Sequence, residues 1–172
     1  TWDSYSVGRP SVLFTNGLFR MWYDGRKDLP EGAPDPNAPK SGTSQRHIGY
    51  ATSRDGFHWE RSGSEPVYDH DAGGIHVLVL GGHLAMLSES RRGTEAAVSR
   101  DGIHWQSAGL LVERTALPSE RHGHVTPFLL PDADGSGAAL FYGAAAEPSW
   151  DVNAICMRRL TGAQWLRLKA QP

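Results

Sequence analysis

Three carboxylic acids stand just ahead of three similar apolar segments, in the parts of those segments that differ most from one another. They are Asp3 in TWDSYSVGRP, Asp71 in YDHDAGGIH and Glu120 in ERHGH. Carboxyl groups that share a cavity can divide acid and base catalysis, because burial and neighbouring charge keep one protonated and another ionised. These residues are therefore the candidate catalytic acids. The alternatives are an exposed loop acid for Asp71 and Glu120, and a turn-capping or hydrogen-bonding role for Asp3.

A second group of candidates lies beside these acids or where the following strands are expected to end. Asp24 and Arg26 recur as Glu89 and Arg91 at the same offset, which favours a structural ion pair or loop anchor. Trp150 lies in a loop, where its ring can either stack on a ligand or anchor the sheet. The candidate substrate-binding residues are Arg9, Asp24, Arg26, His70, His76, His122, His124 and Trp150.

Four of the eight histidines belong to these segments. His122 and His124 are two residues apart, so on a strand both would point to one side and could bind one metal ion, with Asp71 as an oxygen ligand. The alternatives are that the histidines hydrogen-bond a substrate or tune an acid, or that they serve only as scaffold. We expect no obligatory cofactor and keep a divalent metal ion as an alternative.

The elements that position these residues are repeated along the chain. SRDGFHW at 53–59 returns as SRDGIHW at 99–105, NGLFRMWYDGR at 16–26 aligns with GGHLAMLSESR at 81–91, and VGRPSVLF at 7–14 aligns with AGGIHVLV at 72–79. A weaker third copy ends with TGAQW in place of DGFHW. Three units of about 1–66, 67–112 and 113–172 therefore fill a single domain.

Each repeat alternates apolar and polar residues between Gly, Asp and Asn turns, which predicts four short strands and an all-β fold of β-propeller blades. Asp55 with Gly56, and Asp101 with Gly102, are expected to form the turn between the third and fourth strands and to be scaffold. The tryptophan that ends each motif is expected to be wedged between blades. The long connection from Lys27 to Arg46 carries four prolines and is a candidate lid or partner contact.

The segments VGRPSVLF, FRMWYDG and IGYATSRDGFHW resemble the blade signature of the five-bladed β-propeller glycosidase superfamily, which includes glycoside hydrolase families 32, 43, 68 and 130. The resemblance spans nearly the whole chain. It implies three blades of a five-bladed-type propeller, and either an additional chain segment or self-association to complete the ring.

The resemblance also implies a function. Family 43 enzymes use two aspartates and one glutamate from three successive blades as general base, pKa modulator and general acid, and the order Asp3, Asp71, Glu120 is similar. This implies a glycoside hydrolase that acts on a glycoside or oligosaccharide. The alternative is a non-catalytic module that binds sugar, metal or protein and lacks a complete acid and base set. The family implies secretion or a periplasmic location, although TWDSYSVGRP does not resemble a signal peptide.

Composition excludes several other classes of protein. The 172 residues are 39% hydrophobic and carry a formal charge of −2, which gives no electrostatic footprint for nucleic acid or an anionic membrane. No apolar run approaches the ~20 residues of a membrane helix. The single Cys156 excludes an internal disulfide and is expected to be a packed thiol. Motifs such as GxSxG or HExxH are absent, as are the helices between strands that a Rossmann-type fold needs.

Overall fold

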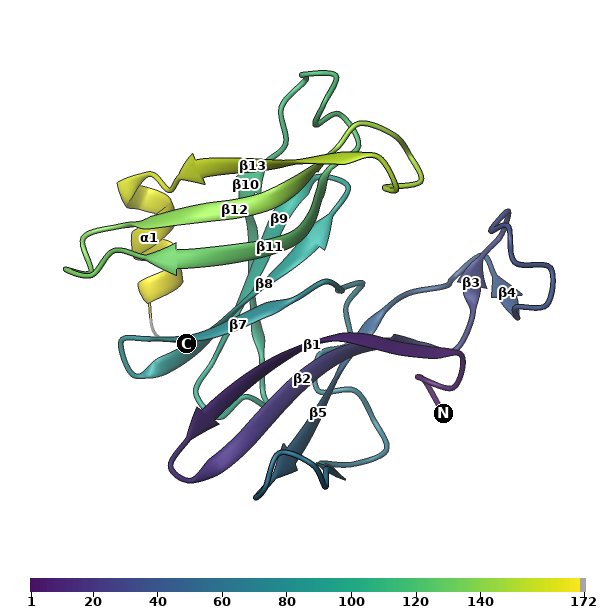
Figure 1. Cartoon of the computed structure of the whole chain (residues 1–172), viewed down its shortest axis with the longest axis horizontal. Coiled ribbons are helices and arrows are strands. Elements are labelled where there is room, and N and C mark those ends of the chain that lie inside the picture. Colours follow the sequence, from purple (N-terminus) through teal and green to yellow (C-terminus); the bar gives the residue numbers. More distant parts are fainter. Residues whose placement is uncertain (171–172) are drawn as a thin grey trace. The chain divides into compact units, whose positions relative to one another are not determined.

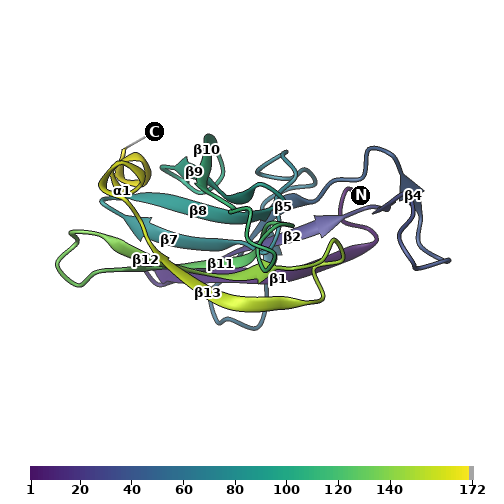
Figure 2. The same ribbon diagram turned by 90° about the horizontal axis from the view of Figure 1, so that it is seen from above.

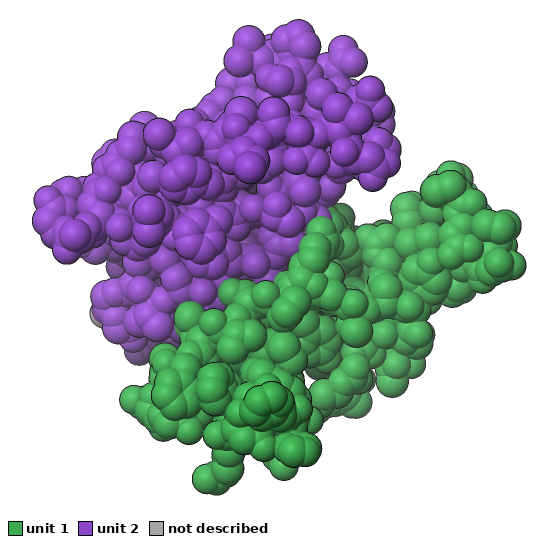
Figure 3. Space-filling model, in the orientation of Figure 1, with its two compact units in different colours: residues 1–73 green, residues 74–172 purple. Residues whose placement is uncertain are grey.

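The computed structural model describes residues 1–170, which are built almost entirely from β-strands. The chain forms two compact units: unit 1 is Thr1–Gly73, and unit 2 begins at Gly74 (Figure 3). Each unit has its own sheet structure, and the all-β expectation is confirmed in both.

Unit 1 is a four-stranded antiparallel sheet in the order β1 (Ser6–Thr15), β2 (Leu18–Arg26), β5 (His47–Ser53) and β6 (Glu60–Arg61) (Figure 1). Asn16 and Gly17 connect β1 to β2 with φ angles of 53° and 75°, as the two-residue hairpin turn requires. On one face of the sheet, Trp22 and Ile48 are fully buried. These are the four strands that the period-two pattern predicts.

The strands of unit 2 are hydrogen-bonded into one seven-stranded antiparallel sheet, which has two parts that share a core and are called its first and second sheets below. The first contains β7 (His76–Leu80), β8 (His83–Ser90), β9 (Gly93–Ser99) and β10 (Gln106–Glu113). The second contains β11 (His124–Pro131), β12 (Ala138–Ala145) and β13 (Asn153–Arg159). The sheets are joined by the pairing of His124 with Ser90 and form two layers in Figure 2. The core includes Leu87 of the first sheet and Leu140 of the second, both fully buried.

The third repeat ends in a helix, so the expectation of a fourth strand there is wrong. Helix α1 (Gly162–Lys169) occupies the position of TGAQW and contributes Trp165 and Leu168 to the core of unit 2. Thr161 and Gln164 form a capping box, in which each side chain accepts a hydrogen bond from the other residue's backbone N–H. No helix in residues 1–170 is long and apolar enough to cross a membrane.

The repeated SRDG segments form matching turns. In the first, the Asp55 Oδ1 accepts hydrogen bonds from the backbone N–H groups of Phe57 and His58, both at 2.8 Å. The Trp59 Nε1 donates back to the Gly56 carbonyl at 3.1 Å, and Gly56 has a φ of 79°. Asp101 and Trp105 make the same bonds in the second turn. The aspartates are scaffold, as expected, and each half-buried tryptophan is tied to its own turn.

The long connection after β2 is an ordered excursion rather than a featureless loop. Its strands β3 (Leu29–Pro30) and β4 (Lys40–Ser41) pair in parallel. The Tyr5 hydroxyl donates to the Asp35 carboxylate at 2.8 Å, which fastens the connection to the start of the chain. Its role as a lid or partner contact stays a prediction.

Replacing Ser99 by Ala should destabilise the chain by about 1–3 kcal/mol, because a buried backbone N–H would lose its acceptor. The Ser99 Oγ accepts from the Gly102 N–H at 2.8 Å and donates to Asp101 at 3.1 Å, and Ser99 has no exposed surface. The measurement is urea unfolding followed by tryptophan fluorescence. Ser119→Ala, at an exposed site, is the control, and equal midpoints for the two variants would contradict this account of the turn.

Candidate functional site

The candidate residues of each unit lie at one end of its sheet, which we call the loop edge. In unit 1 this is where β1 and β5 begin and β2 ends, and in the register Ser6 pairs with Arg26 and Gly25 with His47. In unit 2 it is where β7 and β11 begin and β8 and β12 end. The SRDG turns follow the ends of β5 and β9, at the opposite end. Within each unit, candidates and turns are therefore separated as expected.

Asp3 is a buried carboxylate with two partners that lie far from it in the sequence. Its side chain is 1% exposed and forms an ion pair with Arg61, while the Tyr23 hydroxyl donates to it at 3.4 Å. The Arg61 guanidinium also lies 5.8 Å from the centre of the Tyr23 ring. This arrangement agrees with the alternative of a hydrogen-bonding role for Asp3, with an ion pair in place of a turn cap.

Three arginines and two aspartates gather at the loop edge of unit 1. Arg9 forms a 2.7 Å ion pair with the buried Asp24. The Asp71 Oδ1 accepts a hydrogen bond from the Arg46 backbone N–H at 3.1 Å. The same oxygen lies 3.4 Å from the Nε of the Arg46 side chain. Burial lowers the pKa of Arg26, and the nearby charges of Arg46 and Arg9 lower it further. The structure therefore brings together Arg9, Asp24, Arg26 and Asp71, and adds Arg46.

Asp71 and His70 are the exposed members of the candidate set in unit 1. The Asp71 side chain is 56% exposed, which agrees with the alternative of an exposed loop acid. The His70 ring stacks on Tyr68, with ring centres 4.4 Å apart. Both residues are placed where a bound molecule could reach them.

Glu120 is the most densely bonded carboxylate at the loop edge of unit 2. It is 3% exposed and accepts hydrogen bonds from the Thr115 backbone N–H at 2.9 Å, the Tyr142 hydroxyl at 2.6 Å and the His124 Nε2 at 2.8 Å. The Arg158 guanidinium binds both of its oxygens, at 3.1 and 2.7 Å. Four separate segments of unit 2 therefore donate hydrogen bonds to this one side chain.

These partners keep Glu120 ionised. Burial by itself would raise the pKa of Glu120, but the hydrogen bonds from Thr115, Tyr142 and His124 outweigh it and hold the pKa at about 2. A general acid needs a pKa near the working pH, so this shift is opposite to the one expected of a proton donor. As placed here, Glu120 is a fixed negative charge.

The histidines of unit 2 do not form the pair that the sequence suggested. β11 begins at His124, so His122 lies before the strand and the alternation argument does not apply to it. The His124 ring has no exposed surface and uses both nitrogens, Nδ1 with Thr94 at 2.9 Å and Nε2 with Glu120. Among residues 1–170, no group of three or more His, Cys, Asp or Glu side chains is placed to hold a metal ion.

His76 is held inside the packing of unit 2. Its Nδ1 accepts the Leu129 backbone N–H at 3.0 Å, and its ring stacks on Phe128 with centres 4.3 Å apart. Burial lowers the pKa of His76 to about 4, so the ring is neutral at physiological pH. This geometry describes a link between β7 and β11, and a role in binding substrate stays a prediction.

Trp150 lies in the loop between β12 and β13 and is half-buried. Its Nε1 donates to the His122 carbonyl at 2.8 Å, and the Arg91 guanidinium lies 5.2 Å from its ring centre. The structure therefore brings His122 and Trp150 together. The indole is oriented by the protein, as a stacking platform must be, although the same contacts would also anchor the loop.

The three predicted catalytic acids are divided between the units. Asp3 and Asp71 belong to unit 1, and Glu120 belongs to unit 2. Their convergence on one cavity stays a prediction.

The likeness of this chain to known proteins is one of structure. No protein-family model matches it, and no curated protein matches its sequence. A family 117 glycoside hydrolase, Zg3597 from Zobellia galactanivorans, matches with a TM-score of 0.68 at 17% identity, over 91% of this chain and 52% of that one. A thermostable family 43 glycoside hydrolase matches with a TM-score of 0.62 at 14% identity, over 92% and 49%.

The family 32 β-fructofuranosidase BmSUC1 of Bombyx mori, in a complex with sucrose, matches with a TM-score of 0.64 at 14% identity, over 86% of this chain and 32% of that one. The chain therefore spans about half, or less, of the length of these structures. It has the β-propeller fold of these glycoside hydrolase structures, in the form of a partial propeller.

Glu120→Gln should remove a contribution to the free energy of unfolding that depends on pH. Because the folded pKa of about 2 lies below the ordinary 4.5, the wild type gains stability above pH 4.5 and loses it as the pH falls towards 2. At neutral pH the variant should be less stable by about 3 kcal/mol or more, since Arg158 loses its buried partner. The difference between the two proteins should shrink in acid.

The measurement is urea unfolding of both proteins from pH 7 to 2.5. Glu147→Gln, which changes an exposed carboxyl of the same unit, is the control and should follow the wild type. A difference between Glu120→Gln and the wild type that stays constant with pH would contradict the ionised state assigned to Glu120.

Proposed function

We propose that this chain is a carbohydrate-active protein that binds a glycoside or oligosaccharide at its loop edges. The fold supports this, since structures that share it include glycoside hydrolases of families 32, 43 and 117. The exposed His70 and Asp71 and the oriented Trp150 give the hydrogen-bonding and stacking groups that sugar recognition uses.

The observation that carries the proposal is the fixed orientation of polar groups at both loop edges. Asp3, Asp24 and Glu120 are all buried and are each bonded to an arginine. The arginines that bind these acids are therefore held in place before a ligand arrives. Side chains that are already ordered lose less conformational entropy when a ligand binds. Such preorganised edges support recognition of a polar molecule.

Hydrolysis of the glycosidic bond is the second candidate function. The likeness to families 43 and 32 favours it, and the exposed Asp71 is the acid best placed to meet water or a substrate. The low pKa of Glu120 argues against that residue as the proton donor. The proposal of Asp3, Asp71 and Glu120 as one acid and base set therefore needs a direct test.

Saccharide binding and hydrolysis can be measured separately on the 172-residue chain. We expect binding of at least one member of a plant and marine oligosaccharide panel by calorimetry, weakened about three- to tenfold by Trp150→Ala through lost stacking. Hydrolysis of aryl glycosides should fall about a hundredfold or more in Asp71→Asn if this carboxyl takes part in proton transfer.

Trp105→Phe, at an SRDG turn away from the loop edge, is the control for Trp150→Ala and should bind normally. An unchanged rate in Glu120→Gln would remove Glu120 from the chemistry. Failure to bind any saccharide in the panel would overturn the proposed function as a whole.

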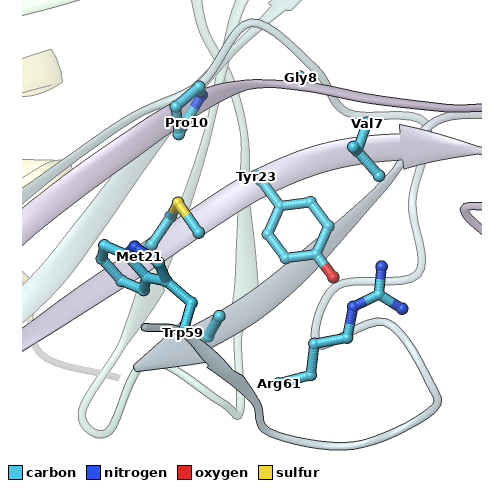
Figure 4. Close-up of a pocket in the computed structure, with 8 residues that line it drawn as sticks. Val7, Gly8, Pro10, Met21, Tyr23, Trp59 and Arg61 are labelled. Carbon is cyan, nitrogen blue, oxygen red and sulfur yellow. The ribbon is translucent and has the colours of Figure 1, made fainter. Parts of the chain in front are cut away.

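We also propose that copies of the chain associate through the exposed apolar faces of their sheets. In unit 1, Val7, Val12 and Phe14 are 57%, 45% and 61% exposed. Beside them lies a hollow of about 310 Å³, in which the Tyr23 hydroxyl points towards Arg61 and Met21 lies next to Trp59 (Figure 4). In unit 2, Ile155 and Met157 of β13 are 87% and 54% exposed.

A second copy is the occupant that these faces suit, because both units present apolar sheet faces of the kind that pack together inside unit 2. A contact between the unit 1 face of one copy and the unit 2 face of another would be heterologous, so it could extend beyond a dimer.

The mass in solution tests this association. We expect a mass above 18.8 kDa that rises with protein concentration in light scattering coupled to size exclusion. Phe14→Lys should shift the distribution towards the monomer, and Glu31→Lys, at an exposed site in the connection that follows β2 at the other end of the sheet, should not. A stable monomer at all concentrations would overturn self-association.

A further inference from the structure

We propose that the arginine cluster of unit 1, formed by Arg9, Arg26 and Arg46, binds the carboxylate of an acidic sugar residue. This inference rests on the proposed saccharide binding and adds the class of saccharide: one that contains uronic acid. It concerns a ligand contact made by arginines, with the candidate acid Asp71 beside them.

The first observation is that two guanidinium groups converge on Gly73. A methyl group at this residue would lie 2.7 Å from a guanidinium nitrogen of Arg9 and 2.7 Å from one of Arg46. Both guanidinium groups therefore approach one point beside the Gly73 backbone. Two planar groups so placed can offer paired N–H donors to the two oxygens of a carboxylate.

The second observation is that three positive charges lie close together. The charges of Arg46 and Arg9 both act on Arg26, and so do the opposite charges of Asp71 and Asp24. The Arg46 side chain is 12% exposed, so water screens its charge poorly. Burial lowers the pKa of Arg26, and the like charges of Arg46 and Arg9 lower it further. An added anion would relieve this repulsion.

The third observation is the position of the cluster. It lies at the loop edge, where β1 begins and β2 ends, together with the exposed Asp71 and His70. A saccharide bound there could place a carboxylate on the arginines and its hydroxyl groups on the neighbouring polar side chains. The paired donors of a guanidinium group can bind two oxygens of a carboxylate or of a sulfate, so the experiment compares a uronate with a sulfated sugar.

The negative charge of Asp71 allows a test of the cluster in which a substitution should tighten binding. Its carboxylate accepts from the Arg46 backbone N–H and lies 3.4 Å from the Arg46 Nε, so it competes with an incoming anion for the same arginine. Asp71→Asn should therefore tighten the binding of a uronate. A residue with only a structural role at this position would not improve binding when it is changed.

The test compares oligomers of galacturonic or glucuronic acid with their methyl esters, which keep the sugar and lose the charge. We expect the 172-residue chain to bind at least one acidic oligomer about tenfold or more tightly than its ester in calorimetry, as the loss of a charge-assisted pair implies. The affinity for the acid should fall as NaCl is raised, and that for the ester should not.

Arg46→Gln and Arg26→Gln should each remove most of the preference for the acid, and Arg46→Lys should keep only part of it, because the ammonium lacks the paired donors. Arg54→Gln, at the SRDG turn, is the matched control and should leave the preference intact. Circular dichroism of each variant checks that the sheet still forms, and Asp71→Asn gives an independent readout in the direction of tighter binding.

The outcomes separate the two proposals. Equal binding of acid and ester, or a preference that survives both glutamine variants, would overturn the arginine assignment and leave saccharide binding standing. Tighter binding of a sulfated oligomer than of the uronate would overturn the carboxylate assignment. Binding of no saccharide at all would overturn the proposed function and this inference with it.

Discussion

A carboxylate that is withdrawn from water must be met by hydrogen-bond donors, and this requirement shapes the loop edge of both units. Asp3, Asp24, Glu89 and Glu120 are each no more than 6% exposed. Each has a donor from a different part of its unit: Arg61 for Asp3, Arg9 for Asp24, the Thr126 backbone N–H for Glu89, and Arg158 for Glu120. The ends of the strands are therefore held together by charge as well as by the sheet.

This requirement also decides which chemistry the edges can support. A carboxylate surrounded by donors is stabilised in its charged form, so it is a good acceptor and a poor source of protons. Glu120 illustrates this, since Tyr142, His124 and Arg158 all favour the ionised state. Asp71 differs because it is half-exposed and held mainly by Arg46. Binding of polar molecules therefore follows more directly from the structure than catalysis does.

The sequence predicted those features that depend on near neighbours. Alternation located the strands, and the SRDG motif located turns whose bonds span no more than three residues. The capping box of Thr161 and Gln164 was equally local and could have revealed α1. The partners of the buried acids could not be predicted in this way. Arg61 lies 58 residues from Asp3, and Arg158 lies 38 from Glu120, so only the fold brings them together.

A residue with a positive φ angle recurs at the start of each repeat, and it links the sheet to the candidate site. Arg9, Gly74 and Thr126 occupy equivalent positions at the entry to the first strand of each repeat, with φ angles of 44°, 52° and 43°. Positive φ is costly for Arg and Thr, and more so before proline, which follows both of them. The register shifts at the kinks in β1 and β11. The kink at Arg9 occurs where its side chain pairs with Asp24, and the kink at Thr126 occurs where its N–H meets Glu89. Backbone strain of this kind persists only where surrounding contacts enforce it, and here the enforcing contacts are the buried carboxylates themselves.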